Sequence, residues 1–190
     1  MLTFEESSHT YLLRIGDEIR RVPSVTEILD QNAFYPNNGA ADRGTRIHKA
    51  IAAGIACEDV DKDIEPWMQA WWDFCMDWQV VPILCETVIY SKTYGYAGTF
   101  DMIAMTSRGC FLIDFKTGIV PKWCRQQTAA YLYAALEYCG PDARITTARR
   151  LALQIAPDGY KVQIHDHTKF ETDFAAFLRA RKVFEQRQVS

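Results

Sequence analysis

The sequence has no run of about 18 apolar residues, which is the length that a membrane-spanning helix needs. Its first residues, MLTFEESSHT, have neither the basic start nor the apolar core of a signal peptide. Internal repeats, low-complexity tracts and Gly/Ser linkers are also missing. We therefore expect a soluble, cytoplasmic protein with no membrane partner, folded as a single domain over residues 1–190.

Cofactor motifs are scarce as well. The six cysteines include no CxxC pair, which argues against a zinc ribbon or a compact iron–sulfur site. Gly39 and Gly44 have the spacing of a P-loop, but Thr45 stands where that loop needs lysine, so no nucleotide site is expected. Lys and Arg number 21 against 24 Asp and Glu, a net charge of −3, which excludes a uniformly basic nucleic-acid coat.

What is present is an ordinary globular composition, with 48% apolar and 24% charged residues. The hydrophobic periods predict a hairpin over 10–22, a short helix with a Ser24–Glu27 capping box, helices over 40–56 and after Pro66, strands over 84–91, 96–105 and 110–117, a helix over 122–139, a hairpin over 148–165 and a helix over 170–187. We therefore predict an α/β fold. A central mixed sheet flanked by helices spans 81–190, after an N-terminal hairpin and helical subregion over 1–80.

Two carboxylates are predicted to face each other in the central hairpin. If residues 106–109 form its loop, Met105 faces Cys110 and Asp101 lies directly opposite Asp114. Two carboxylates at that separation repel each other unless a cation lies between them. Because their neighbours are apolar, burial of either charge without a partner is also unfavourable by several kcal/mol. A divalent metal ion removes both penalties.

Lys116 follows Asp114 by two positions and therefore lies on the same face of the strand. Carboxylate oxygens beside an ammonium suit Mg²⁺ or Mn²⁺ at a phosphate better than Zn²⁺. In this interpretation the ion polarises the phosphate and activates a water, and Lys116 positions or deprotonates that water. The alternative is a surface ion pair between Asp114 and Lys116, with Asp101 as an acid near a turn.

The segment GTFDMIAM…CFLIDFKTG…QQTAAY resembles the PD-(D/E)XK nuclease superfamily, in its RecB-like exonuclease branch. An upstream stretch, RGTRIH, is similar to a histidine motif of the same branch, and PSVTEIL is similar to the opening of small phage and mitochondrial single-strand exonucleases. The resemblance covers most of the chain and implies a restriction-endonuclease-like fold. The matched positions are Arg43, Gly44, Thr45, His48, Gly98, Asp101, Asp114, Lys116, Gln127 and Tyr131.

This resemblance implies a role for each matched position. The implied metal ligands are His48, Asp101, Asp114 and the backbone carbonyl of Phe115, and Lys116 is the implied catalytic lysine beside the two catalytic aspartates. Contacts to the scissile strand and its phosphate are implied for Gln127, Tyr131, Thr117 and Arg43. Glu86 lies where some relatives carry a further acid.

The implied activity is that of a Mg²⁺- or Mn²⁺-dependent deoxyribonuclease, an exonuclease that prefers single-stranded ends. Its setting would be phage-type DNA replication, recombination or repair in a bacterial or phage-infected cell. DNA is the expected partner, and a recombination or single-strand-binding protein is a further candidate. Some relatives hold an iron–sulfur cluster through clustered C-terminal cysteines, but no cysteine follows Cys139 here, so no cluster is expected. Two alternatives stay open: a structure- or site-specific endonuclease of the same superfamily, and a non-catalytic DNA-end-binding adaptor.

Charge is unevenly distributed along the chain. Residues 92–131 contain five bases and two acids, whereas residues 57–77 contain seven acids and one lysine. We expect a confined basic groove for DNA with an acidic flank. The five bases of this segment are Lys92, Arg108, Lys116, Lys122 and Arg125, and the last helix adds Lys169, Arg179, Arg181, Lys182 and Arg187. The stripe of Trp67, Trp71 and Trp78 is interpreted as core, and His165 and His167 as surface residues.

Overall fold

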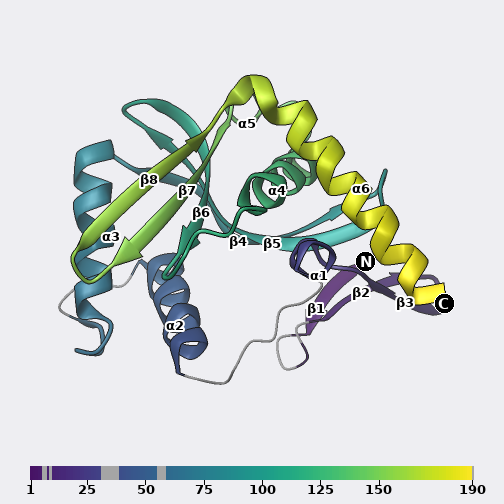
Figure 1. Cartoon of the computed structure of the whole chain (residues 1–190), viewed down its shortest axis with the longest axis horizontal. Helices are drawn as coiled ribbons and strands as arrows, with labels where there is room; N and C mark the ends of the chain where they lie inside the picture. The colour runs from purple at the N-terminus through teal and green to yellow at the C-terminus, as the bar shows by residue number, and fades with distance from the viewer. Residues whose placement is uncertain (6–7, 9, 31–38, 55–58, 190) are drawn as a thin grey trace.

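The computed structural model describes residues 1–5, 8, 10–30, 39–54 and 59–189, and Figure 1 shows its mixed α/β architecture. The central sheet has the strand order β4-β5-β6-β7-β8, and all neighbours are antiparallel except β6 and β7, which are parallel. Helices flank this sheet, which confirms the predicted fold class. The five strands are β4 (Val81–Ser91), β5 (Tyr96–Thr106), β6 (Gly109–Lys116), β7 (Arg149–Ala156) and β8 (Gly159–His165).

A smaller antiparallel sheet precedes it, with β1 (Leu2–Glu5), β2 (Thr10–Ile15) and β3 (Glu18–Val22) in sequence order. Strand β1 is not predicted from the sequence, because a four-residue segment shows too little alternation. The predicted capping box opens helix α1 (Val25–Leu29): the backbone N–H of Glu27 donates to Ser24 Oγ at 3.0 Å. Ser24 also bridges to Ala97 of β5, which joins the small sheet to the central one.

Four longer helices follow the predicted order, with boundaries that differ by a few residues: α2 (Ala40–Ala53), α3 (Glu65–Trp78), α4 (Cys124–Cys139) and α6 (Phe170–Val189). The short helix α5 (Ala143–Thr146) and the 3₁₀ turn η2 (His167–Lys169) were not predicted. The predicted continuation of α2 to Ala56, like Cys57, lies outside the described residues. No helix in the described ranges is long and apolar enough to cross a membrane.

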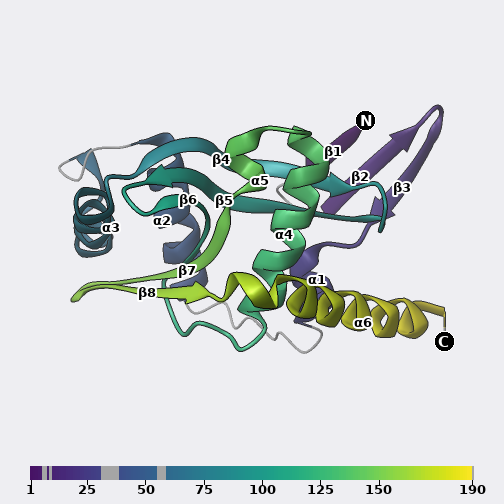
Figure 2. The ribbon, with the colours of Figure 1, turned by 90° about the horizontal axis from the view of Figure 1, so that it is seen from above.

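The central sheet separates two apolar cores. Helices α1, α4 and α6 pack on one face, where Phe100 and Leu112 meet Phe177. Helices α2 and α3 pack on the other face, where Phe111 and Phe115 meet the tryptophan stripe. Figures 1 and 2 show the two helical layers on either side of the strands. Trp71 and Trp78 are buried, whereas Trp67 is only partly buried against the same core.

Strands β5 and β6 pair in the predicted register, although the turn is tighter than expected. Thr106 pairs with Gly109 around a two-residue turn, in place of a four-residue loop, and Met105 still faces Cys110. The recorded pairs end at Met102 and Ile113. Beyond that point β5 stays paired with β4, and β6 stays paired with β7. Asp101 and Asp114, the next opposed positions, therefore lie where the two strands part.

Candidate active site

A cavity of about 1190 Å³ opens at the place where β5 and β6 diverge. Its walls come from β1 and α1 on one side, from α2 on another, and from β4, β5, β6 and α4. It is lined by every predicted site residue except Arg43, namely His48, Glu86, Asp101, Asp114, Phe115, Lys116, Thr117, Gln127 and Tyr131. The fold thus brings together residues that are up to 83 positions apart in the sequence.

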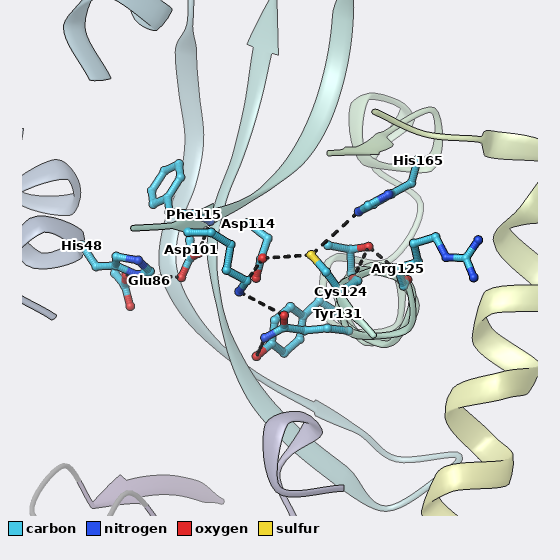
Figure 3. Close-up of polar contacts among 12 residues, drawn as sticks. His48, Glu86, Asp101, Asp114, Phe115, Cys124, Arg125, Tyr131 and His165 are labelled. Carbon is cyan, nitrogen blue, oxygen red and sulfur yellow. Dashed lines mark hydrogen bonds and ion pairs between the residues drawn. The ribbon is translucent and has the colours of Figure 1, made fainter. Parts of the chain in front are cut away.

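Three potential metal ligands converge at one end of this cavity. His48, Glu86 and Asp101 each offer a ligand atom, and these atoms lie within 4.8 Å of one another. His48 Nδ1 is 3.2 Å from Asp101 Oδ1 and 4.0 Å from Glu86 Oε1 (Figure 3). One imidazole nitrogen with two carboxylates is a donor set that a divalent cation such as Mn²⁺ accepts.

Local structure explains why these side chains meet. In α2, Ile47 and Ile51 lie one turn apart on a face that is buried against the sheet, and His48 lies beside this face, one turn before Ile51. Glu86 and Asp101 occupy opposed positions, because the pairs on either side of them share one register. Glu86 has a positive φ of 40°, a backbone conformation that side chains other than glycine rarely adopt and that is often found at functional sites.

The pKa values of all three side chains in this group are shifted from their ordinary values. Burial and the nearby charge of Asp101 raise the pKa of Glu86 to about 7. Burial opposes ionisation of Asp101, but the positive charge of His48 and its hydrogen bond hold the pKa of Asp101 below its ordinary value. For His48, the carboxylate of Asp101 outweighs burial and raises the pKa of the imidazole. Crowded acids of this kind are a chemical environment that favours a bound cation.

Asp114 and Lys116 form a second cluster on the α4 side of the sheet. Lys116 Nζ lies 2.6 Å from Asp114 Oδ2 and donates to Gln127 Oε1 at 3.1 Å. Gln127 Nε2 in turn donates to the Tyr131 hydroxyl at 3.3 Å. Asp114 is only 2% exposed, so its pairing with Lys116 is not the surface ion pair of the alternative interpretation. Burial, together with the charge of Asp101, raises the pKa of Asp114.

The backbone of Phe115 links the two clusters. Its N–H donates to Asp101 Oδ2 at 2.6 Å, so the aspartate carboxylate caps the strand where ladder pairing stops. The Phe115 ring packs edge-on against His48, with 5.6 Å between ring centroids, and against Trp71 of α3. Phe115 therefore fixes the separation between the His48 group and the Asp114 group. Its predicted role as a carbonyl ligand stays a prediction.

Two glycines of the predicted motifs allow close approach of other groups. A Cβ atom added to Gly98 would lie 2.6 Å from Tyr131 Cε1, so only glycine at this position lets Tyr131 pack against β5. A Cβ atom at Gly44 would lie 3.0 Å from Thr117 Oγ1, at the cavity wall. Both glycines thus serve residues predicted to contact the substrate.

The predicted DNA contacts are only partly assembled around the cavity. The guanidinium of Arg43 lies over the Trp67 ring, 4.6 Å from its centroid, and Arg43 is not among the residues that line the cavity. Of the five bases expected to form a basic groove, the described lining includes Lys116, while Arg108 lies over Trp78 and Arg125 faces Asp173. A basic groove formed by all five residues is therefore not what the structure shows.

Sequence reasoning missed a buried polar network behind Asp114. Cys124 Sγ donates to Asp114 Oδ2 at 3.4 Å and lies 3.9 Å from His165 Nε2. His165 is 2% exposed, so its interpretation as a surface residue is wrong. Arg150, the largest fully buried side chain, pairs with the buried Asp173 at 3.0 Å. The sequence did carry a signal for the buried ion pair, because Arg150 and Asp173 each interrupt an otherwise apolar strand or helix face.

The fold and the site together define an α/β protein with a candidate divalent-metal site beside a buried Asp–Lys pair. The predicted ligands were His48, Asp101, Asp114 and the Phe115 carbonyl. In the described residues, the compact donor group contains His48 and Asp101 with Glu86, whereas Asp114 is turned to Lys116 and Cys124. Glu86 is thus placed more centrally than its sequence position suggested.

No protein-family model and no curated protein matches this chain. Among solved structures, the chain is similar to the crystal structure of an alkaline exonuclease, LHK-Exo, from Laribacter hongkongensis, with 14% sequence identity and a TM-score of 0.33. The alignment covers 87% of this chain and 92% of that chain. A TM-score of this size lends no weight to a functional assignment, which depends here on the geometry of the site.

Proposed function

We propose that this chain is a divalent-metal-dependent nuclease that hydrolyses phosphodiester bonds in DNA. The observation that supports this most is the convergence of His48, Glu86 and Asp101 in one cavity with the buried pair of Asp114 and Lys116. A bound Mg²⁺ or Mn²⁺ would neutralise charge on the phosphate and lower the pKa of a water molecule. Folding alone gives no reason to gather the three acids Glu86, Asp101 and Asp114 in one cavity, because their charges repel one another.

In this proposal the side chains divide the work. His48, Glu86 and Asp101 hold the ion, and Asp114, which lies across the diverging strands from them, supplies a further ligand oxygen. Lys116 presents its ammonium beside Asp114, where it attracts and orients a phosphate oxygen or the attacking water. Gln127 holds Lys116 in place through Oε1, and its amide and the Tyr131 hydroxyl line the cavity for the substrate strand.

We further propose that the enzyme is an exonuclease that prefers single-stranded ends. Apolar groups at the edge of the cavity support this: Phe4 of β1, Ile119, which is 91% exposed, and Trp123. Unpaired bases expose π-faces that can stack on the rings of Phe4 and Trp123 and pack against Ile119, whereas a duplex hides them. The lining also includes four acids, Asp30, Glu86, Asp101 and Asp114, so phosphate attraction by basic residues alone is weak here.

The proposal is tested with end-labelled linear single strands, linear duplex and circular single strands, each with Mg²⁺, Mn²⁺ or EDTA. We expect metal-dependent release of short products from linear single strands and none from circles. Cutting of circles would support the endonuclease instead. Binding of ends without cleavage under any metal would support the adaptor.

A substitution identifies the site as the source of that activity. Lys116→Gln keeps a hydrogen-bond donor but removes the charge, and we expect cleavage to fall by about 100-fold or more. Lys62→Gln, at an exposed lysine in the turn before α3, is the matched control and should cleave like the wild type. Equal activity of the two purified variants would overturn the proposed function.

A further inference from the structure

Cys124, the first residue of α4, has its thiol enclosed between two polar side chains. The sulfur lies 3.4 Å from Asp114 Oδ2 on one side and 3.9 Å from His165 Nε2 on the other, and the residue is 1% exposed (Figure 3). A hydrogen on the sulfur accounts for this contact, because a thiolate and a carboxylate at 3.4 Å would repel each other. A buried, protonated thiol is a poor nucleophile but still a hydrogen-bond donor.

The donors and acceptors of this chain of groups can run in only one direction. An ionised carboxylate accepts hydrogen bonds and cannot donate, so the single thiol proton of Cys124 points to Asp114. The sulfur can then only accept from His165, which must carry its proton on Nε2. Burial and the charge of Arg150 lower the pKa of His165 to about 4, which is consistent with a neutral ring in this position.

The contacts on Asp114 are unevenly distributed between its two oxygens. The ammonium of Lys116, at 2.6 Å, and the thiol of Cys124, at 3.4 Å, both approach Oδ2. Among the described residues, no hydrogen bond to Oδ1 accompanies these two. The carboxylate is therefore held through Oδ2, and Asp114 is one of the residues that line the cavity.

The first turn of α4 is itself anchored. Arg150 of β7 donates to the backbone carbonyl of Arg125 at 2.8 Å and pairs with Asp173 of α6 at 3.0 Å. This holds the residue after Cys124 against the sheet, and the position of the thiol follows from it. Outer residues that fix the orientation of a functional carboxylate commonly change metal affinity or activity by about 10- to 100-fold when they are removed.

We propose that Cys124 is a positioning residue of the active site, whose thiol holds Asp114 by Oδ2 so that Oδ1 is presented to the bound cation. This inference rests on the proposed nuclease function. Cys124 acts through Asp114 and touches neither DNA nor the ion. The proposal predicts that metal affinity and kcat depend on a hydrogen-bond donor at position 124 and not on the sulfur atom itself.

Three substitutions separate the donor from the volume. Cys124→Ala removes both, Cys124→Val keeps volume without a donor, and Cys124→Ser keeps the donor. Cys110→Ala is the matched control, because Cys110 is another buried cysteine, 5% exposed, that packs in the core away from the cavity. Each full-length variant is measured for its melting temperature, for Mn²⁺ affinity by titration calorimetry, and for kcat and KM on a linear single strand.

We expect Cys124→Ala and Cys124→Val to bind Mn²⁺ about tenfold more weakly and to show a kcat about tenfold lower, with KM for DNA unchanged. Cys124→Ser and Cys110→Ala should stay near the wild type in both measurements. The proposal is overturned if Cys124→Val matches the wild type, or if Cys124→Ser is as impaired as Cys124→Ala. A wild-type protein that binds Mn²⁺ but cleaves nothing would instead overturn the nuclease function, and the Mn²⁺ affinities would still test the role of Cys124.

Discussion

The ion pair between Arg150 and Asp173 is the most deeply buried charge pair in the described part of the chain. The two side chains are 1% and 5% exposed, and the guanidinium also donates to the carbonyl of Arg125 at 2.8 Å. Arg150→Met keeps most of the apolar stem and removes the charge. Asp173 would then retain only the more distant Arg125, whose Nε lies 3.8 Å away.

The magnitude follows from this geometry. Removing one partner of a buried pair leaves an uncompensated charge and lowers the free energy of unfolding by about 3–5 kcal/mol. Because Arg125 remains nearby, we expect the lower end of this range. For a domain of this size, a loss of about 3 kcal/mol lowers the melting temperature by about 6–12 °C. The double variant Arg150→Met/Asp173→Leu should recover most of the loss, since no buried charge is left.

The assay is urea unfolding of both variants and of a matched control. Arg20→Met makes the same substitution in an ion pair of similar length, 2.8 Å, whose side chains are 63% and 58% exposed. We expect no measurable change for that control. The prediction is wrong if Arg150→Met and Arg20→Met unfold at the same urea concentration, or if the double variant is no more stable than Arg150→Met.

Three further predictions concern packing, pH and metal binding. Gly98→Ala should lower the free energy of unfolding by about 1–3 kcal/mol, because the new Cβ would lie 2.6 Å from Tyr131 Cε1. The control is Gly118→Ala, where the added Cβ meets open space and urea unfolding should be unchanged. The pKa of His165 is about 4 in the folded protein and about 6.5 in the unfolded chain, so the folded state binds fewer protons and loses stability as the pH falls from 6.5 to 4. Between pH 7 and pH 4, the free energy of unfolding of His165→Asn should therefore fall by about 3 kcal/mol less than that of the wild type. Equal losses in the two proteins would contradict this. Mn²⁺ at about 100 times its dissociation constant should stabilise the wild type by about 2.7 kcal/mol and raise its melting temperature. His48→Ala should abolish most of this rise in melting temperature, and an undiminished rise would exclude His48 as a ligand.

Local patterns predict much of the fold. The pairing of Met105 with Cys110 follows from the alternation of apolar residues and the short turn, and the Ser24 cap follows from a four-residue signature. The same local period places Asp114 and Lys116 on one strand face, and the structure finds them in contact. These features are readable because every interacting residue lies within a few positions of its partner.

Other features depend on contacts between distant segments, which no local period encodes. Glu86 joins His48 only because β4 pairs with β5 and α2 contacts β5. The network from Asp114 through Cys124 to His165 requires α4, β6 and the end of β8 to meet. Arg43 matches a motif in sequence, yet its guanidinium lies over Trp67 of α3.

The sequence by itself therefore determined most of the elements, the central register and nine of the residues that line the cavity. The tertiary structure decided which of those residues share a metal site, which of them hold one another in place, and where Arg43 and His165 point. The physical reason is that a strand or helix is specified by the periodic pattern of its own residues, whereas a site is specified by the packing of several strands and helices against one another. Packing depends on the volume and charge of side chains from several elements at once.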